Sequence, residues 1–247
     1  MNKKKRQNRT VLITGVTSGI GQAIALKFAQ EGWNIVGHYH SSKKKSDELK
    51  YIVQKFNVEL HLLKVDFSSE EQVKAFVKRL PKFTIDSLVN NAGTYVVSRH
   101  FSQLSIAQID KTFMVNVFAP MAISAQVFVA MKQQGFGRIV NISSIAAKYG
   151  GSAYSLHYGS SKRALEGITK TLAREGAQSN VLVNTIRPGV IDTDFHKKFP
   201  KDMEKRVSLI PMHRIGNPVE VAETVFYLGS DKNSYITNEV ITIAGGE

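Results

Sequence analysis

The sequence predicts an α/β fold, a doubly wound parallel sheet of seven strands with helices on both faces. Short apolar runs rich in β-branched residues, typical of buried parallel strands, alternate with helical periodicity along the chain. A glycine-rich segment follows the first of these runs and opens a helix. The 247 residues suffice for one domain with a substantial core, and they show no internal repeat or linker.

Composition limits the chemistry. The chain has no cysteine, which excludes disulfides, thiolate metal sites and cysteine nucleophiles. Its net charge of +13 would suit an acidic partner or substrate, and ordinary solubility is the alternative reading. Five Lys and Arg residues lie within residues 1–9, which we read as a disordered basic tail before a single domain of residues 10–247.

We expect no nucleic-acid partner, because that role rests on charge alone and lacks a recognition motif. The apolar run after the tail is interrupted by Thr14 and Gly15, so it does not read as a secretory signal. We also expect that no stretch is long enough to span a membrane. These expectations give a cytoplasmic protein with no membrane contact.

The first strand, Thr10–Thr14, leads into glycines spaced G-x-x-x-G-x-G and then a helix that ends near Gly32. A strand, a glycine-rich turn and a helix N-terminus form a phosphate-binding site, because the glycines admit the pyrophosphate and the helix offers N–H donors. A tight turn without a ligand is the alternative. The candidate cofactor contacts here are Gly15, Thr17, Ser18, Gly19, Ile20 and Gly21.

The second strand, residues 33–39, is followed by His40, Ser41 and lysines at 43–45, with no acid before Asp47. An NAD site usually has an acid near this point for the ribose 2′-hydroxyl, whereas lysines welcome a 2′-phosphate. We therefore expect NADP(H) to be preferred, with NAD(H) as the alternative cofactor. We place His40 beside the adenosine and expect no metal site. The lysines could also be the solvated start of a helix, which we place at residues 47–56.

Two further strands supply candidate contacts. The third, residues 59–65, ends in Asp66 and Phe67, and Asp66 suits a hydrogen bond from the adenine amino group. Capping of the following helix by Asp66 or Ser68 is the alternative. The fourth, residues 85–90, runs into small residues that leave room for a ligand, although a structural turn would look the same. These residues are Asn91, Ala92 and Gly93.

Tyr158 and Lys162 are four residues apart at the start of a long helical pattern, so they share a face. A neighbouring ammonium favours the phenolate and lowers the tyrosine pKa toward the working range. The pair is therefore a candidate general acid/base, and a solvated helix edge is the alternative. We expect Leu165, Ile168 and Leu172 to continue this face and pack on the sheet.

Three motifs together resemble the short-chain dehydrogenase/reductase family. They are the glycine segment of residues 14–21, the segment Asn90-Asn91-Ala92-Gly93 and the pair Tyr158-x-x-x-Lys162. The resemblance covers the chain from Thr10 onward. It implies a Rossmann-type fold and an NAD(P)H-dependent oxidoreductase that transfers hydride between nicotinamide and a carbonyl or alcohol carbon.

The resemblance also implies roles for single residues. Asn116, in a helical stretch from about 104 to 132 broken near Pro120, would extend a proton relay from Lys162. Ser144, after the strand Gly137–Ile142, would hydrogen-bond the substrate carbonyl, with Ser143 as the alternative. A segment after the strand at 181–186 would hold the nicotinamide carboxamide. Its residues are Pro188, Gly189, Ile191 and Thr193.

The end of the chain bears on the substrate. Residues 194–209 read as an amphipathic lid helix or an ordinary packed helix, before a helix at 219–228 and a strand at 239–244. The patterns at 210–222 and 235–240 resemble 3-oxoacyl-acyl-carrier-protein reductases of fatty acid biosynthesis. They imply an acyl-thioester substrate, acyl carrier protein as a partner and a homotetramer.

One departure keeps the alternatives open. Gln133, Gln134 and Ser179 stand where those reductases often present arginines to the carrier. A small ketone, sugar or steroid-like alcohol is therefore the alternative substrate. A non-catalytic dinucleotide-binding regulator is a further alternative, but the set Asn116, Ser144, Tyr158 and Lys162 argues against it, because a mere binder needs no acid/base.

Overall fold

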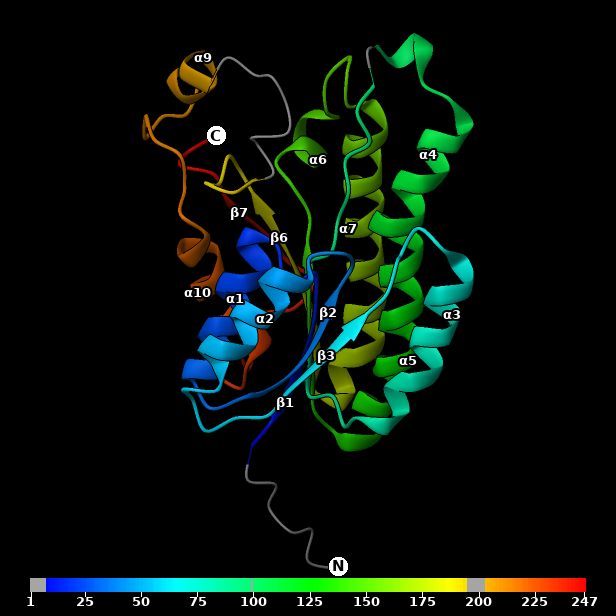
Figure 1. The fold of residues 1–247 in the computed structure, drawn as a ribbon, viewed down its shortest axis with the longest axis vertical. Coiled ribbons are helices and arrows are strands. Elements are labelled where there is room, and N and C mark those ends of the chain that lie inside the picture. The colour runs from blue at the N-terminus through cyan, green and yellow to red at the C-terminus, as the bar shows by residue number, and fades with distance from the viewer. Residues whose placement is uncertain (1–7, 99, 195–202) are drawn as a thin grey trace, which may run out of the picture.

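The computed structural model describes residues 8–247 except residue 99 and residues 195–202. A sheet of seven parallel strands lies at its centre, in the order β3-β2-β1-β4-β5-β6-β7 (Figure 1). The predicted fold class is confirmed. The strands are β1 Thr10–Thr14, β2 Asn34–Tyr39, β3 Leu60–Lys64, β4 Ser87–Asn90, β5 Gly137–Ile142, β6 Val181–Pro188 and β7 Val240–Ile243.

The strand order creates a switch point at the carboxyl edge of the sheet. The chain builds outward from β1 to β3 and then returns to the other side of β1 to begin β4. β1 therefore pairs with two strands, with Val11 opposite Ile35 of β2 and Ser87 of β4. At such a switch point the flanking connections leave in opposite directions, which opens a ligand site.

Helices cover both faces. α1, α2 and α10 enclose one core around Phe28 and Val225, whereas α3, α5 and α7 enclose the other around Phe76 and Ile123 (Figure 1). The α-helices are α1 Gly19–Gln30, α2 Lys43–Val53, α3 Glu70–Arg79, α4 Ile106–Phe113, α5 Ala119–Gln134, α6 Ala146–Tyr149, α7 Leu156–Gly176, α9 Met203–Ser208 and α10 Pro218–Gly229. Short 3-10 turns lie at Leu80–Lys82, Phe101–Gln103 and Ala177–Ser179.

The long helical stretch is interrupted close to the expected position. α4 passes into a π-helical turn, Met114–Phe118, before α5 begins. Pro120 has no N–H to donate to the carbonyl of Asn116 four residues earlier, so the regular bond cannot form and the turn widens. Asn116 thus lies where the backbone departs from α-helix.

One helical run among the described residues, Ile106–Gln134, is long and apolar enough to cross a membrane, with mean hydropathy 1.7. The expectation that no stretch is long enough is therefore wrong. A single such helix is weak evidence for insertion, because a core helix of a globular protein has the same length and composition. Here Ile123, Val127 and Met131 belong to the second core.

The two ends of the chain depart from expectation. Residues 1–7 of the predicted tail lie outside the described residues, but Arg9 stacks 3.7 Å from the ring centroid of Phe136 and faces Asp231 at 3.6 Å. The last residues of the expected tail are therefore packed. Of the expected helix at 194–209, α9 covers the end, and residues 195–202 lie outside the described residues.

Candidate active site

The glycine-rich turn joins β1 to α1 and fits its sequence closely. Gly15 has a positive φ of 74°, and its N–H donates to the His38 carbonyl at 2.9 Å. A Cβ on Gly21 would lie 2.1 Å from the Gly15 carbonyl oxygen, so no side chain fits there. Ser18 caps α1 by accepting a bond from the Gly21 N–H at 3.1 Å.

This turn has the donors that a phosphate needs. The N–H groups of Gly19 and Ile20 lie in the first turn of α1 and bond to no other described residue. No acidic residue lies in that turn, so the helix dipole is left positive. The cradle that only glycine can form, together with these donors, fits a dinucleotide pyrophosphate. Thr17 lies beside them in the same turn, half-buried.

The segment Asn91-Ala92-Gly93 is tied directly to the turn. The hydroxyl of Thr14 accepts bonds from the Asn91 N–H at 3.0 Å and the Ala92 N–H at 2.9 Å. The Asn91 side chain donates to the Thr14 and Gly15 carbonyls at 2.9 and 3.1 Å. Asn91 therefore holds the glycine turn against the end of β4.

The side chain of His38 accepts a hydrogen bond from the glycine-rich turn, a role that was not predicted from the sequence. Its Nδ1 accepts from the Gly15 N–H at 3.2 Å, and its Nε2 lies 3.0 Å from the Val65 carbonyl. Its ring stacks on Phe67 with centroids 3.8 Å apart. Burial lowers the pKa of His38 to about 4, so the ring is neutral and can accept that bond. A histidine in a strand of apolar residues, just after the glycine motif, was the available signal.

The residues expected at the adenosine lie at the carboxyl ends of β2 and β3. Asp66 accepts bonds from the N–H and hydroxyl of Ser68 at 2.8 and 2.7 Å, and lies 3.7 Å from Nε2 of His40. The helix cap is instead Ser69, which accepts from the Gln72 N–H, so the capping alternative for Asp66 or Ser68 is wrong. Ser41 is exposed beside His40. Phe67 is buried, so a ligand can reach only its backbone.

Tyr158 lies in the first turn of α7 and is half-buried. Burial raises the pKa of its hydroxyl, and a hydrogen bond with Ser144 offsets part of that rise. Lys162 lies with Nζ 6.0 Å from the Tyr158 ring centroid and donates instead to the Ile142 carbonyl at 2.8 Å. Burial lowers the pKa of Lys162 to about 8. The expected net lowering of the Tyr158 pKa is therefore wrong for this structure, in which burial dominates and Tyr158 stays protonated at neutral pH.

Asn116 and Lys162 meet at Gly93. A Cβ on Gly93 would lie 3.1 Å from Nζ of Lys162 and 3.5 Å from Oδ1 of Asn116. Asn116 accepts from the Thr94 N–H at 2.7 Å and donates to the Thr94 carbonyl and the Ser161 hydroxyl, each at 2.9 Å. The amide thus fixes the chain after Gly93 to α7, one residue from Lys162.

The two candidate serines face different partners. The hydroxyl of Ser143 donates to Oε1 of Glu166 at 2.8 Å and lies 3.2 Å from the Lys162 carbonyl, away from Tyr158. Ser144 bonds to Tyr158 and accepts from the Ala146 N–H at 3.1 Å. The geometry therefore favours Ser144 as the residue beside the reacting oxygen.

Behind the site lies a buried ion pair that sequence reasoning also missed. Both oxygens of Glu166 accept from Arg187 at 2.6 Å, and Glu166 is 4% exposed. The pair ties α7 to the end of β6. The buried face of α7 accordingly carries Glu166 and Thr169 beside Leu165. Leu172 packs against the second core as expected, whereas Ile168 is only half-buried.

The segment after β6 crosses the carboxyl edge toward the glycine turn. Pro188 ends β6, and the Gly189 N–H donates to the Ile243 carbonyl at 2.8 Å. Ile191 is buried and bridges to Gly216. A Cβ on Gly19 would lie 2.6 Å from Cγ2 of Thr193, so Thr193 lies directly against the turn. The segment after β6 therefore packs against the glycine turn, where the cofactor is predicted to bind.

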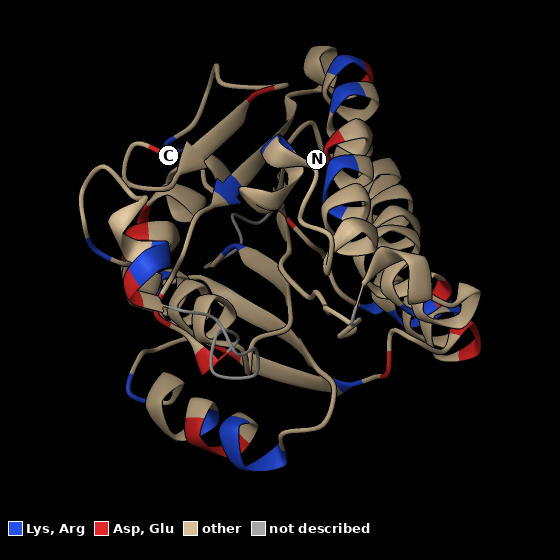
Figure 2. Cartoon of the chain, turned by 90° about the horizontal axis from the view of Figure 1, so that it is seen from above, with Lys and Arg blue, Asp and Glu red and all other residues tan. Residues whose placement is uncertain are grey.

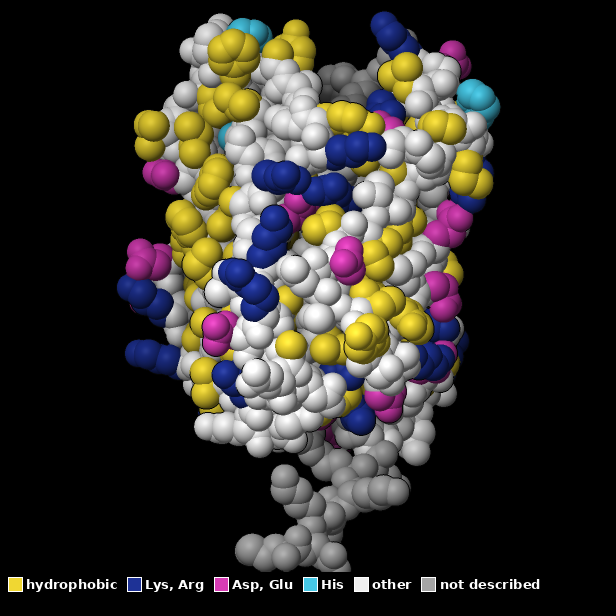
Figure 3. Space-filling model, turned by 180° about the vertical axis from the view of Figure 1, so that it is seen from behind, with side chains coloured by type: hydrophobic (Ala, Val, Ile, Leu, Met, Phe, Trp, Pro, Cys, Tyr) yellow, Lys and Arg dark blue, Asp and Glu magenta, His cyan; other side chains and the backbone are white. Residues whose placement is uncertain are grey.

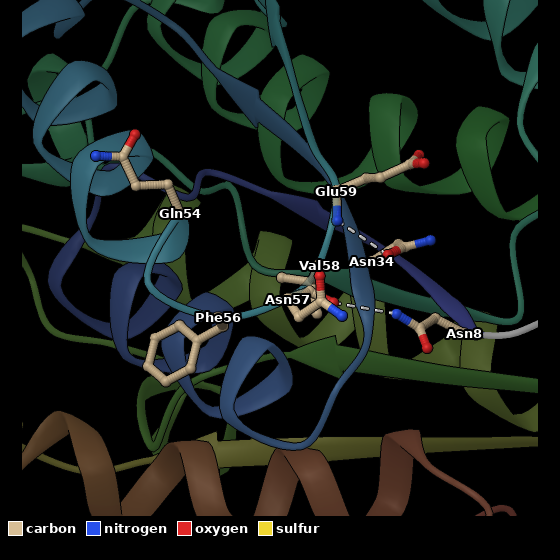
Figure 4. A pocket seen from close by; sticks show the side chains of 7 residues that line it. All are labelled: Asn8, Asn34, Gln54, Phe56, Asn57, Val58 and Glu59. Carbon is tan, nitrogen blue, oxygen red and sulfur yellow. Dashed lines mark hydrogen bonds between the residues drawn. The ribbon is translucent and has the colours of Figure 1, made fainter.

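Charged residues surround the carboxyl edge of the sheet (Figure 2), and a groove lies at the opposite edge. Seen onto the end that carries α6 and α9, Lys, Arg, Asp and Glu lie mainly on the surrounding helices, and the middle is mostly uncharged (Figure 2). A groove at the opposite edge lies among Asn8, Asn34, Gln54 and the loop 56–59, before β3 (Figure 4). Its side chains bond to backbone groups of the loop, with Asn8 Nδ2 3.4 Å from the Asn57 carbonyl. None of the predicted site residues lines it.

Comparisons with known proteins agree with the fold and with the motifs of the candidate active site. A family model described as enoyl-(acyl carrier protein) reductase matches residues 15–247. FabG of Aquifex aeolicus, a 3-oxoacyl-(acyl-carrier-protein) reductase, is 35% identical over 245 residues, which cover 98% of each chain. The protein of the same name from Thermotoga maritima is 36% identical over 97% of this chain and 98% of its own.

Solved structures extend the likeness to three dimensions. YwfH, an NADPH-dependent reductase involved in bacilysin biosynthesis, superposes with a TM-score of 0.89 at 27% identity, over 97% of this chain and 98% of its own. A 3-oxoacyl-(acyl-carrier-protein) reductase from Agrobacterium tumefaciens with NADP bound gives 0.88 at 26% identity, over 97% and 94%. By sequence, by fold and by the glycine, asparagine and tyrosine–lysine motifs, the chain belongs to the short-chain dehydrogenase/reductase family of NAD(P)-dependent oxidoreductases.

Proposed function

We propose that this oxidoreductase uses NADPH to reduce the keto group of a 3-oxoacyl thioester to a secondary alcohol, a reaction of fatty acid biosynthesis. One observation supports the catalytic role. Tyr158 is hydrogen-bonded to Ser144, and Lys162 lies one turn further along the same helix. The side chains of Lys162 and Asn116 both lie next to Gly93. Gly93 in turn follows the asparagine that braces the glycine turn. A proton donor and the proposed dinucleotide cradle are therefore linked through residues 91–93.

The residues around the crevice fit a dinucleotide along its whole length. The glycine turn would hold the pyrophosphate, Asp66 the adenine and the segment after β6 the nicotinamide. NADP is favoured over NAD because His40, Ser41 and the lysines that open α2 include no acid, and because several similar structures are described with NADP or NADPH. The proposed contacts are Gly15, Thr17, Ser18, Gly19, Ile20, Gly21, His40, Ser41, Asp66, Phe67, Asn91, Ala92, Gly93, Tyr158, Lys162, Pro188, Gly189, Ile191 and Thr193.

The side chains have distinct tasks in reduction. The bound cofactor supplies the hydride. Tyr158 donates a proton to the oxygen on which negative charge develops, and the raised pKa of its hydroxyl keeps that proton in place until it is needed. Ser144 donates a hydrogen bond to the same oxygen. Lys162, charged below pH of about 8, stabilises the Tyr158 anion and holds the ribose hydroxyls, and Asn116 keeps the chain after Gly93 in register with α7.

The thioester is favoured by the relatives whose names state that substrate, and acyl carrier protein is the proposed partner. A net charge of +13 complements an acidic carrier. Gln133, Gln134 and Ser179 weigh against the carrier. The second candidate is therefore a free ketone or alcohol, because similar structures include a levodione reductase and a protein described as an NAD(P)-dependent gluconate 5-dehydrogenase.

A homotetramer and a cytoplasmic location complete the proposal. Apolar side chains run along the edge of the molecule formed by α4 and α5 (Figure 3). Ile106, Phe118, Met121 and Val129 there are 48–72% exposed, which is unusual for large apolar residues on a monomer. Burial between copies would cover them. Sedimentation of the full chain tests this, and a monomer at micromolar concentration would contradict it.

Turnover of NADPH against a substrate panel tests the reaction. The panel is acetoacetyl thioester on acyl carrier protein and on coenzyme A, a cyclic diketone and a 5-keto sugar acid. We expect the carrier thioester to give the highest kcat/KM. Preference for the diketone or sugar acid would favour the second candidate, and silence across the panel with tight NADPH binding would favour a regulator.

Tyr158→Phe tests the chemistry. We expect turnover to fall by about 10²-fold or more, the scale of general-acid catalysis, with NADPH affinity retained. Tyr154→Phe is the matched control, because Tyr154 is an exposed tyrosine in the loop before α7. Turnover in Tyr158→Phe equal to wild type would refute the assignment.

A further inference from the structure

An ion pair joins α2 to the segment that follows β6. Nζ of Lys45, in the first turn of α2, lies 2.6 Å from Oδ2 of Asp194, 149 residues away in sequence. The two side chains are 43% and 55% exposed, so both can change partners without burying a charge. Neither the fold nor the proposed reaction requires this contact.

Lys45 lies where the adenosine end of the cofactor would lie. α2 begins four residues after the end of β2, directly behind His40 and Ser41. Its first turn has no acid, and Ser42 at its N-cap makes no side-chain capping bond. Of the lysines at 43–45, only Lys45 forms an ion pair with another residue of the described chain. Lys45 is therefore the lysine of this group whose ammonium already has a carboxylate partner.

Asp194 lies at the end of the segment that crosses the glycine turn. The buried Ile191 bridges to Gly216 and fixes the start of the segment, and Thr193 lies against Gly19. The next residue, Asp194, reaches α2. The ion pair thus ties the end of this segment to α2. The segment therefore runs beside the glycine turn from the expected nicotinamide position to the expected adenosine position.

A 2′-phosphate in this place would meet both charges. A phosphate monoester carries about −1.5 to −2 charge at neutral pH, so it attracts the Lys45 ammonium and repels the Asp194 carboxylate. Because the phosphate carries more negative charge than a carboxylate, it attracts the ammonium more strongly, and the exposed carboxylate–lysine pair that it replaces contributes little. Lys45 would therefore exchange Asp194 for the phosphate, whereas a 2′-hydroxyl would leave the pair intact.

We propose that Asp194 is a specificity-determining residue of the cofactor site, because its carboxylate competes with the 2′-phosphate of NADP for Lys45. Asp194 limits the preference for NADP, and binding of NADP separates Asp194 from α2, whereas binding of NAD does not. This inference rests on the proposed cofactor site, and it adds a residue outside the motifs that identify the site.

Binding of each cofactor to four proteins tests the competition. Dissociation constants for NADPH and NADH are measured by fluorescence titration, without turnover, for wild type, Asp194→Asn, Lys45→Gln and the double variant. We expect Asp194→Asn to tighten NADPH binding about three- to fivefold, within the range of one exposed pair, and to leave NADH within about 1.5-fold. Lys45→Gln should weaken NADPH alone. In the Lys45→Gln background the gain from Asp194→Asn should fall below about twofold, because there is no lysine to release.

Glu70→Gln is the matched control. Glu70 pairs with Lys74 at 2.6 Å on the exposed face of α3, so the substitution removes an equivalent surface pair and charge away from the crevice. It should change neither dissociation constant. If Asp194→Asn leaves NADPH binding unchanged, or changes both cofactors equally, the competition is refuted while the cofactor site stands. If wild type binds neither cofactor, the proposed function and this inference fail together.

Discussion

Lys162→Met should make the protein more stable at neutral pH while it abolishes turnover. Lys162 is 3% exposed, and burial lowers the pKa of its ammonium from 10.5 to about 8. At 1.36 kcal/mol per pKa unit, this change corresponds to about 3 kcal/mol by which the charged form opposes folding. Methionine has nearly the same length and carries no charge, so it removes that opposition.

The gain is reduced by what the substitution takes away. Nζ of Lys162 donates to the Ile142 carbonyl at 2.8 Å, and a buried carbonyl that loses its donor costs about 1–3 kcal/mol. We therefore expect a net stabilisation of about 1 kcal/mol near pH 7. For a chain of this length that is a rise in Tm of about 2–4 °C.

The pH dependence makes the prediction specific. Between pH 8 and 10.5 the unfolded lysine holds a proton that the folded one has lost, so wild-type stability rises with pH relative to the variant. The measurement is urea unfolding of both proteins at pH 7, 8.5 and 10. The free energy of unfolding of the wild type should increase relative to that of the variant as pH increases. Lys162→Met that is less stable than wild type at pH 7, with a difference independent of pH, would refute the reasoning. Lys170→Met, on the exposed side of α7, is the control and should show no such trend.

Three further predictions follow from the same contacts. Ser144→Ala should lower kcat by about 10²-fold, as loss of one donor to a developing oxyanion does, whereas Ser143→Ala should keep kcat and lose stability because its hydroxyl serves Glu166. Glu166→Gln should cost about 3–5 kcal/mol in unfolding experiments, because Arg187 loses its buried charge partner, and an unchanged midpoint would contradict this. Burial depresses the pKa of His38 from 6.5 to about 4, so wild type should lose stability as pH falls from 6.5 to 4, and His38→Asn should lose less over that range, as thermal unfolding can show.

The fold was predictable because its signals are local. Each strand is a short apolar run, and each begins and ends within two residues of its expected bounds. The parallel, doubly wound class followed from the alternation of strands and helices along the chain. The π-helical turn before Pro120 was visible only as a helix break, because its form depends on which carbonyl finds a donor after Pro120 removes one.

The candidate site was predictable only where residues recur at fixed spacing. Gly21 and Asn91 could be found because a backbone conformation or a brace requires that residue type at that place. Glu166 could not be found, because its partner Arg187 lies 21 residues away on another element and no spacing links them. The pKa of Tyr158 was misjudged for a related reason: sequence spacing places an ammonium on the same helix face, but burial and the Ile142 carbonyl decide what that ammonium does.

The contacts of the residues around Lys162 explain how the protein holds the buried Lys162 ammonium although its charge opposes folding. Lys162 is bracketed on α7 by Ser161, which bonds to Asn116, and by Glu166, which is clamped to β6 by Arg187. Its own carbonyl lies 3.2 Å from the hydroxyl of Ser143. Each contact fixes the helix rather than the Nζ, so the lysine is kept in place by its neighbours and not by a counter-charge. A carboxylate beside Nζ would remove the folding penalty, but it would also neutralise the charge that Tyr158 needs when it releases its proton. The protein therefore stabilises α7 at Glu166, one turn away, and the ammonium of Lys162 has no carboxylate partner among the described residues.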